Sequence, residues 1–309
     1  MRIGVDIGGT KCAVVLGDEN GVAEKIKFNT EDCKTTLERI FDAVGAIGKA
    51  DSIGVSSGGP LDERRGVIMS PPNLPGWDNI PITEMLSDKF GVPAYLCNDA
   101  NASALAEWRY GAGQGTDNMV FLTFGTGLGA GIIMNGGLIS GFSGMAGELG
   151  HVRLSDSGPI GYGKAGSVEG FCSGSGIRQL GIQMAKEALL RGENMPYCCK
   201  SEDDLSSINA KILADAARLG DRTALEVYRI SGEALGRALA IVVDLLNPER
   251  IIIGSIFTRA EDLLRPHMER TLSCEALSLS LSACKILPSG LGEEIGDYAA
   301  LSVAYLGDK

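Results

Sequence analysis

The same arrangement of strand, glycine turn and strand occurs twice in this chain, and the repeat limits the folds open to it. In the first copy, residues 3–16, two apolar runs flank a turn at Gly8 and Gly9. In the second copy, residues 120–133, Gly125 stands at the position of Gly8 after an offset of 117 residues. Each copy predicts two strands joined as a hairpin. The chain therefore consists of two related halves.

The glycine turns suit phosphate groups. Because they lack side chains, Gly8 and Gly9 let backbone N–H groups approach an anion closely, and Thr10 and Lys11 add side-chain donors. The P-loop pattern GxxxxGK[ST] is absent, and a strand follows the glycines where a P-loop has a helix. A tight turn without a ligand is the alternative for this motif alone. Two such hairpins facing a cleft would be able to clamp a triphosphate.

The second copy also satisfies the dinucleotide fingerprint GxGxxG/A. Gly125, Gly127 and Ala130 occupy its small-residue positions, and Glu148 lies 23 residues beyond Gly125. The fingerprint requires a helix after the glycines. Here residues 130–137 form a strand-like run that ends in a turn. We therefore interpret this segment as strand, turn and strand.

A carboxylate lies where a predicted strand meets a predicted helix. The strand-like run covers residues 93–97, the helix-like run covers residues 102–108, and Asn98-Asp99-Ala100-Asn101 lies between them. Rigid elements would hold such a carboxylate where a substrate hydroxyl can reach it. Asp99 is therefore a candidate general base. The alternative is an N-cap, because Asp and Asn often cap helices.

Two loops in the first half offer polar groups to a ligand. Residues 52–56 predict a strand that opens into a glycine loop at Gly59, and ligands often lie at such strand ends. Residues 69–77 contain three prolines and cannot form regular structure. We expect an ordered loop there, with Asn73 as its polar group and Trp77 as its anchor.

Two later segments, in the second half of the chain, also offer polar groups to a ligand. Glu148 and His151 form a Glu-x-x-His pair, but a metal site of the helical-bundle type needs a second copy, and this segment is too rich in glycine for a bundle. Polar side chains on such a loop suit hydrogen bonding to a polyhydroxylated ligand. The buried strand predicted at residues 250–255 ends in Gly254 and Ser255, where a ligand can also lie.

Length and composition favour a two-lobed protein that acts on small molecules. The 309 residues suffice for two lobes of roughly 100 to 200 residues. The net charge of −11 argues against nucleic acid or an anionic membrane as a partner, because both bind basic faces. No secretory signal or membrane-spanning run is recognisable, so we expect a cytoplasmic protein. The eight cysteines include no CxxC pair, which disfavours a disulfide framework.

The linker-like residues 111–116 suggest the boundary between the lobes. We expect a small N-terminal α/β lobe at residues 1–113, joined by a C-terminal helix at residues 293–309. A larger α/β lobe would comprise residues 114–292.

Together, these segments resemble the ROK family of sugar kinases and sugar-responsive repressors, within the actin, Hsp70 and hexokinase superfamily. The resemblance spans essentially the whole chain. Residues 6–10 resemble the first phosphate motif, residues 125–127 the second, and residues 253–254 the adenosine strand. Residues 98–101 resemble the catalytic motif and residues 147–151 the sugar-binding segment. The resemblance implies a two-lobed α/β, actin-like ATPase fold, which duplicates a ribonuclease H-like unit around an interlobe cleft.

The resemblance also implies an activity. The expected reaction transfers the γ-phosphate of ATP, with Mg²⁺, to the 6-hydroxyl of a hexose. An N-acetylmannosamine or N-acetylglucosamine kinase and a sugar-responsive regulator are the alternatives. Asp99 would be the base that removes the hydroxyl proton, and Asp6 would act on the magnesium side. The residues that hold sugar hydroxyls would be Gly59, Asn73, Asn98, Asp99, Glu148, His151 and Glu169. The residues that bind ATP and magnesium would be Asp6, Gly8, Gly9, Thr10, Lys11, Gly125, Thr126, Gly127, Gly254 and Ser255.

Three features favour the kinase over the repressor. Repressors of the family carry an added N-terminal winged-helix domain, whereas the phosphate motif here begins at Asp6. The acidic composition also disfavours DNA, and the intact glycine motifs favour ATP. A homodimer is the assembly that the resemblance implies.

The chain departs from the family at one site. Many ROK proteins hold a structural zinc through the histidine of the Gly-Glu-Leu-Gly-His segment and three cysteines of a CxCGxxGCxE stretch. Here Ile160, Tyr162 and Ser167 occupy the cysteine positions, and none offers a thiolate. We therefore predict no structural zinc. We also expect Ile160 and Tyr162 to hold the loop by apolar packing, which leaves His151 free to bind the sugar.

Overall fold

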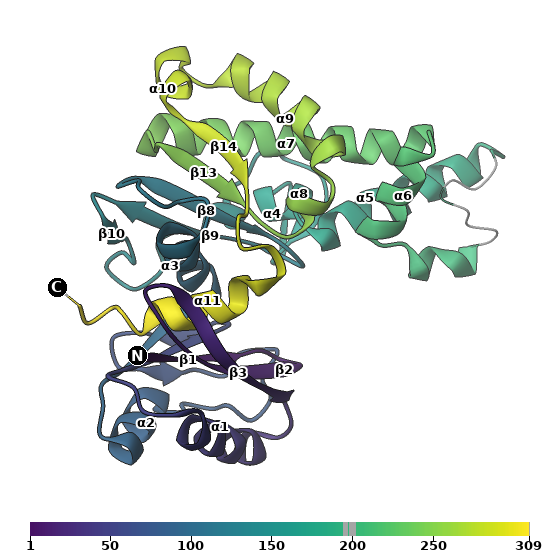
Figure 1. The fold of residues 1–309 in the computed structure, drawn as a ribbon. Coiled ribbons are helices and arrows are strands. Elements are labelled where there is room, and N and C mark those ends of the chain that lie inside the picture. The colour runs from purple at the N-terminus through teal and green to yellow at the C-terminus, as the bar shows by residue number, and fades with distance from the viewer. Residues whose placement is uncertain (194–196, 198–201, 309) are drawn as a thin grey trace. The chain divides into compact units, whose positions relative to one another are not determined.

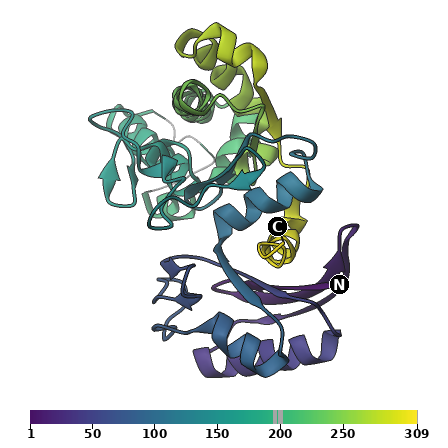
Figure 2. The ribbon, with the colours of Figure 1, turned by 90° about the vertical axis from the view of Figure 1, so that its left-hand side faces the viewer.

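The computed structural model describes residues 1–193, 197 and 202–308. Contacts divide the chain into two compact units, which are drawn in Figures 1 and 2. The first unit comprises Met1–Phe121, Gly131–Ala146 and Gly290–Lys309, and the second comprises Leu122–Ala130 and Gly147–Ser289. Among the described residues, none of the helices has the length and apolar character needed to cross a bilayer.

The first sheet has the strand order β3-β2-β1-β4-β7. Its strands are β1 (Arg2–Ile7), β2 (Lys11–Asp18), β3 (Gly21–Asn29), β4 (Ile53–Ser57) and β7 (Ala94–Asn98). β2 pairs antiparallel with β1 and β3, while β4 pairs parallel with β1 and β7. The hairpin predicted at residues 3–16 is confirmed, with Ile7 opposite Cys12 at its closed end.

The second sheet repeats this plan, with the order β10-β9-β8-β13-β14. Its strands are β8 (Met119–Phe124), β9 (Leu128–Met134), β10 (Gly137–Leu138), β13 (Arg250–Ile253) and β14 (Lys285–Pro288). Position by position, β8 and β9 correspond to β1 and β2, and the parallel pair β13 and β14 corresponds to β4 and β7. The strand, turn and strand predicted at residues 120–133 is confirmed, and so is the repeat of the two halves.

In the first unit, helices cover both faces of the sheet. They are α1 (Cys33–Ile47), α2 (Ile82–Phe90), α3 (Asp99–Tyr110) and α11 (Ile295–Val303). Apolar residues of α1 and α2 share one core with β1 and β4, and Figure 1 shows both helices on one side of the strands. α11 lies on the other side against β1 and β4, and in Figure 2 it is seen along its axis beside α3.

The alternation of side chains along β1 explains this layering. Ile3 and Val5 are buried in the core shared with α1, so the residues between them face α11. Gly4 allows the helix backbone to come close, because a Cβ there would collide with the backbone nitrogen of Leu301. Asp6 lies on the same face as Gly4. The strand pattern therefore directs the Asp6 carboxylate toward α11.

The second unit is largely helical. Its helices are α4 (Val168–Phe171), α5 (Gly174–Leu190), α6 (Ala210–Arg218), α7 (Arg222–Leu246), α8 (Ile256–Arg259), α9 (Glu261–Glu275) and α10 (Ser278–Ala283). α7 and α9 pack closely, since a Cβ on Gly232 would lie 2.8 Å from the Leu264 carbonyl oxygen and one on Gly236 would lie 2.6 Å from that of Met268. The C-cap of α7 is Asn247, which adopts the left-handed conformation directly before Pro248.

Short elements complete the chain. The strands are β5 (Leu61–Asp62), β6 (Val67–Ile68), β11 (Ile160–Gly161) and β12 (Lys164–Ala165), and the 3₁₀ helices are η1 (Leu149–His151), η2 (Glu202–Ser207) and η3 (Gly292–Glu294). Residues 111–116, which read as a linker in the sequence, are grouped with the first unit. They pack there because a carboxylate oxygen of Glu107 accepts the Ala112 N–H at 2.8 Å. The chain passes between the units after Phe121, Ala130, Ala146 and Ser289.

Candidate active site

A backbone hydrogen bond closes the first glycine turn, and the loop that contains Asn73 packs against it. The Gly8 N–H donates to the Lys11 carbonyl at 3.1 Å, and the Thr30 hydroxyl donates to the Gly8 carbonyl at 2.6 Å. A Cβ on Gly8 would lie 2.8 Å from the Lys11 oxygen, and one on Gly9 would lie 2.7 Å from the carbonyl oxygen of Asn73. Both glycines are therefore required by space, and Gly9 is exposed at the tip of the turn.

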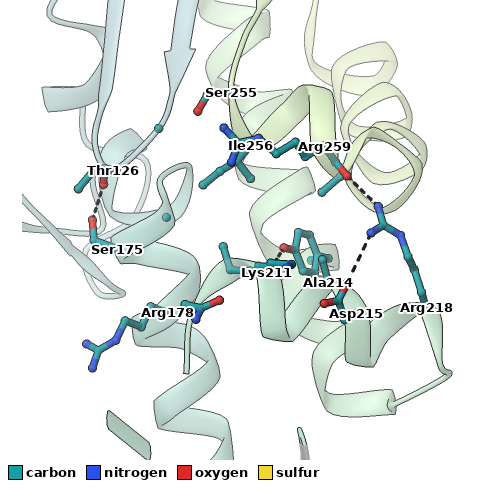
Figure 3. A pocket seen from close by; sticks show the side chains of 16 residues that line it. Thr126, Ser175, Arg178, Lys211, Ala214, Asp215, Arg218, Ser255, Ile256 and Arg259 are labelled. Atoms are coloured by element: carbon teal, nitrogen blue, oxygen red, sulfur yellow. Dashed lines mark hydrogen bonds and ion pairs between the residues drawn. The ribbon is translucent and has the colours of Figure 1, made fainter. Parts of the chain in front are cut away.

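The second glycine turn is held by the start of a helix. The Gly125 N–H donates to the Gly127 carbonyl at 3.0 Å. At the first turn of α5, the Gly174 N–H donates to the Gly125 carbonyl at 2.8 Å, and the Ser175 hydroxyl donates to the Thr126 carbonyl at 2.8 Å (Figure 3). The N-terminus of α5 therefore lies directly beside this turn, and such a helix end favours anions.

A cavity of about 670 Å³ opens beside the second turn, entirely within the second unit. Its floor is apolar, with the Tyr228 ring fixed by a 2.7 Å hydrogen bond from its hydroxyl to the Ala210 carbonyl. Ser255, which has φ +61°, lies at its edge between β13 and α8. Four basic side chains also line it, namely Arg178, Lys211, Arg218 and Arg259 (Figure 3). The volume and this mixture of walls suit a nucleotide.

Arg218 is fixed in place at this cavity. Its guanidinium donates to both carboxylate oxygens of Asp262, at 2.9 and 2.7 Å, and to the Arg259 carbonyl at 2.8 Å (Figure 3 shows the last contact). Arg178 donates to the Ser206 carbonyl at 3.2 Å. At the edge of this cavity, hydrogen bonds therefore hold some of the basic side chains in place, while others are exposed.

Asp99 does not cap its helix. The Asn98 side-chain oxygen accepts the Asn101 N–H at 2.7 Å, so Asn98 is the N-cap of α3 and Asp99 is its first residue. The capping alternative for Asp99 is therefore wrong, and its carboxylate is available for other contacts. Solvent reaches the Asp99 carboxylate, yet the protein atoms around it exclude part of its hydration and raise its pKa.

Asp6 belongs to a group of carboxylates in the first unit. Burial, followed by the charges of Asp297 and Asp99, raises the pKa of Asp6 to about 7. A Cβ on Gly296 would lie 3.1 Å from an Asp6 carboxylate oxygen, so the start of α11 leaves room for that group. Asp297 forms an ion pair with Lys25.

These carboxylates suit a divalent cation, because neighbouring like charges are relieved by a positive ion between them. Among the described residues, no group of three or more His, Cys, Asp and Glu side chains could hold a metal ion. Magnesium usually keeps several waters and binds proteins through one or two carboxylates together with substrate phosphates. The carboxylates present here, chiefly that of Asp6, fit this mode of magnesium binding.

The two loops predicted in the first unit are present. Trp77 is fully buried, which confirms it as the anchor of residues 69–77, while Asn73 in the same loop is exposed. Gly59 lies in the loop after β4, and a Cβ there would have only the Leu61 nitrogen nearby, at 3.9 Å. The polar tip of one loop and the backbone of the other are therefore open to a ligand.

In the second unit, the segment of Glu148 and His151 lies against β9. Gly147 and Gly150 permit this, because a Cβ on either would collide with a carbonyl oxygen of β9. Glu148 and His151 are both exposed. A carboxylate oxygen of Glu169 accepts the Leu128 N–H at 3.0 Å. The structure therefore joins Glu169 to the second glycine turn.

The expected apolar packing of Ile160 and Tyr162 is wrong. Ile160 is 54% exposed and Tyr162 is 87% exposed. The loop is held by polar contacts instead, because the Gln179 amide accepts from the Ile160 N–H at 2.9 Å and donates to the Ile160 carbonyl at 2.8 Å. Tyr162 meets only the edge of the His151 ring, with 6.2 Å between ring centroids.

The third cysteine position has a structural role of its own. Ser167 is completely buried, and its hydroxyl accepts the Gly170 N–H at 3.1 Å as the N-cap of α4. With an aliphatic side chain, a phenol and this capping hydroxyl at the three positions, the donor set does not fit structural zinc.

Several residues of these sites were not predicted from the sequence. Ser175 and Arg218 lie in α5 and α6, where no motif indicates a ligand, and Asp297 lies in α11. A polar residue at the start of α5 was a visible signal, since Ser173-Gly174-Ser175-Gly176 precedes an apolar helical run. No local pattern indicates Asp297, because it depends on the contact of α11 with β1.

Comparison with known proteins gives consistent matches over the whole chain. The ROK family profile matches residues 2–304. A glucokinase of Thermotoga maritima is 34% identical over 309 residues, which cover 97% of this chain and 96% of that protein. The crystal structure of a ROK family glucokinase from Streptomyces griseus, in complex with glucose and AMPPNP, is 29% identical with a TM-score of 0.77 and covers 99% of both chains.

A ROK family transcriptional regulator, a homologue of the E. coli MLC protein, is also similar in structure. Its TM-score is 0.83 at 25% identity, and the match covers 98% of this chain but 77% of the regulator. These similarities confirm the expected α/β, actin-like fold.

Proposed function

The chain belongs to the ROK family, and from this we propose that it is an ATP-dependent sugar kinase that phosphorylates the 6-hydroxyl of a hexose. The observation that carries the proposal is the junction of β7 and α3. Asn98 caps the helix there and leaves the Asp99 carboxylate exposed. A regulator needs to bind a sugar but has no use for a base with an adjusted pKa.

Asp99 serves as the general base. The sugar 6-hydroxyl gives its proton to Asp99 while its oxygen forms a bond to the γ-phosphorus of ATP. The bond between that phosphorus and the bridging oxygen breaks, and ADP leaves with the electron pair. Because burial raises the pKa of Asp99, its carboxylate is a stronger base than that of a free aspartate.

The phosphates and the adenosine have separate places in this proposal. The two glycine turns cradle the phosphates, with Gly8, Gly9, Thr10 and Lys11 on one and Gly125, Thr126 and Gly127 on the other. The cavity of the second unit, with Gly254 and Ser255 at its edge, takes the adenosine. Asp6 would hold magnesium, which would supply positive charge to the phosphate oxygens.

The sugar is held by hydrogen bonds, for which exposed amide, carboxylate and imidazole groups are suitable donors and acceptors. The proposed ligands are Gly59, Asn73, Asn98, Asp99, Glu148, His151 and Glu169. Glu169 also contacts the second glycine turn, so its carboxylate links sugar binding to the phosphate end of the site.

A coupled assay of ADP release tests the activity. The sugars are glucose, mannose, fructose, allose, N-acetylglucosamine and N-acetylmannosamine, each with ATP and magnesium. We expect sugar-dependent ADP release with at least one of the plain hexoses. ADP release with N-acetylated sugars alone would mean that the substrate is an N-acetylhexosamine and not a plain hexose. ADP release with none of the sugars would overturn the proposed function.

Asp99→Asn tests the catalytic role. The amide keeps the size of the side chain but cannot accept the hydroxyl proton, so turnover should fall about 100-fold or more. Sugar affinity measured by calorimetry should change far less. Asp88→Asn, at an exposed position of α2, is the matched control and should retain turnover. An Asp99→Asn protein with near-normal turnover would remove Asp99 from the mechanism.

A further inference from the structure

Glu63 contacts the backbone of the residue that precedes Asp99. Glu63 lies between β5 and β6, in the stretch that follows the Gly59 loop. One of its carboxylate oxygens accepts the Asn98 N–H at 2.9 Å. The two residues are 35 positions apart in the chain and both belong to the first unit.

This contact closes the exposed edge of the first sheet. β7 is the last strand of the order β3-β2-β1-β4-β7, so its second edge has no neighbouring strand within the described part of the chain. Asn98 is the final residue of β7 and pairs with Ser57 of β4 on its other side. An N–H at an open edge needs an acceptor, and a charged acceptor forms a stronger hydrogen bond than a neutral one. Glu63 supplies that acceptor.

Asn98 is consequently fixed from two directions. Its N–H is held by Glu63, and its side-chain oxygen accepts the Asn101 N–H at 2.7 Å. The backbone of Asn98, with φ −70° and ψ 158°, sets the direction in which the chain enters α3. Asp99 is the first residue of that helix, so the position of its carboxylate follows from the position of Asn98.

The setting of Glu63 leaves it accessible to water. Glu63, Cys97 and Tyr95 line a cavity of about 840 Å³ in the first unit, and Glu63 is partly buried there. The neighbouring Asp62 accepts the Arg65 N–H at 3.0 Å, which turns the chain between β5 and β6. Water in this cavity would replace a lost carboxylate at the Asn98 N–H, but it would not fix the geometry of that N–H.

We propose that Glu63 is a positioning residue that orients Asp99 for proton transfer through its hydrogen bond to the Asn98 backbone. The role rests on the proposed function, because it presupposes that Asp99 takes the hydroxyl proton. The same hydrogen bond joins the stretch that follows the Gly59 loop to the catalytic junction.

The test compares three variants. Glu63→Ala removes the acceptor, and Glu63→Gln keeps an oxygen of the same reach without the charge. Glu84→Ala, at an exposed glutamate of α2, is the matched control for loss of a carboxylate in the same unit. We measure kcat, the KM for sugar and for ATP, and hydrogen exchange at the Asn98 amide in the folded proteins.

We expect Glu63→Ala to lower kcat about 10-fold or more, with the KM for ATP changed less than about twofold. Glu63→Gln should recover most of the lost kcat, and Glu84→Ala should match the unaltered protein. A Glu63→Ala protein with lower thermal stability but unchanged kcat would overturn the proposal, since it would show that Glu63 acts on the fold alone.

Hydrogen exchange distinguishes a failure of the positioning role of Glu63 from a failure of the proposed kinase function. If no sugar is phosphorylated by the unaltered protein, the kinase assignment fails and the positioning role falls with it. Faster exchange at Asn98 in Glu63→Ala would still establish the anchoring contact. Unchanged exchange at Asn98, together with full activity on a sugar, would overturn the role of Glu63 and leave the kinase assignment intact.

Discussion

Asp6 makes the stability of the first unit dependent on pH. The raised pKa of about 7, against 3.8 for an ordinary aspartate, means that the folded protein binds more protons than the unfolded chain between these values. The stabilising contribution of Asp6 is therefore fully present below about pH 4 and is lost as the pH rises through 7. At pH 8 the ionised Asp6 is partly buried beside the Asp297 and Asp99 carboxylates, and the charges of Lys25 and Lys27 offset this only in part.

Asp6→Asn should remove this dependence. Without magnesium or nucleotide, we expect the variant to be more stable than the unaltered protein at pH 8 by about 1 to 3 kcal/mol, after allowing for partial screening by water. The difference should shrink toward pH 4. Urea unfolding at pH 5, 6, 7 and 8 measures it, with Asp88→Asn as the exposed control. A difference that is the same at every pH would show that Asp6 is not the titrating group.

Gly9 tests the space between the first turn and its loop. A Cβ at this position would lie 2.7 Å from the Asn73 carbonyl oxygen and 2.9 Å from the Asn73 Cβ, so Gly9→Ala must displace the loop. We expect a loss of about 1 to 3 kcal/mol in the free energy of unfolding. Gly58→Ala is the control, because a Cβ there meets no atom within 4 Å. Equal stability of the two variants would contradict the observed close approach.

At the scale of elements, Glu107 joins the end of α3 to two other segments. Its buried carboxylate accepts N–H groups from Ala112 at 2.8 Å and from Gly290 and Leu291, both at 3.1 Å. Residue 290 is where the chain re-enters the first unit before α11. One side chain therefore fixes the position of α11, which in turn lies against Asp6.

Glu107→Ala should leave three backbone donors without their acceptor. We expect a cost of about 3 to 5 kcal/mol, because each unsatisfied buried group costs roughly 1 to 3 kcal/mol and water satisfies part of the loss. Glu107→Gln should cost less, since one oxygen remains. The free energy of unfolding in urea measures both, with Glu38→Ala on the exposed face of α1 as the control. A cost below 1 kcal/mol for Glu107→Ala would show that the segments are held by other contacts.

Elements whose signals are local could be predicted from the sequence. The two hairpins, the helix after Asp99 and the buried Trp77 all follow from glycine, proline and apolar spacing within short segments. What failed depends on contacts between distant residues. Gln179 of α5 holds Ile160 of β11, and Glu63 reaches Asn98 from a loop 35 residues earlier. The predicted packing of Ile160 and Tyr162 was wrong because the apolar character of a side chain in a loop does not determine whether it is buried.

At the scale of the whole molecule, the replaced cysteines predict the metal content. We expect the purified protein to carry no stoichiometric zinc, because Ile160, Tyr162 and Ser167 cannot act as thiolate ligands. Elemental analysis after gel filtration in metal-free buffer measures this, and a zinc-binding ROK protein prepared in the same way is the control. Activity should survive a zinc chelator once magnesium is restored. About one zinc per chain would refute the prediction.

The two sheets share a strand order but differ in what is inserted between their strands. Only residues 30–52 separate β3 from β4, whereas residues 139–249 separate β10 from β13. Glu148, His151 and Glu169 lie in this longer insertion, while both glycine turns lie on strands common to the two halves. A replacement of loops within residues 139–249 would therefore alter these three proposed sugar ligands and leave the phosphate-binding hairpins unchanged.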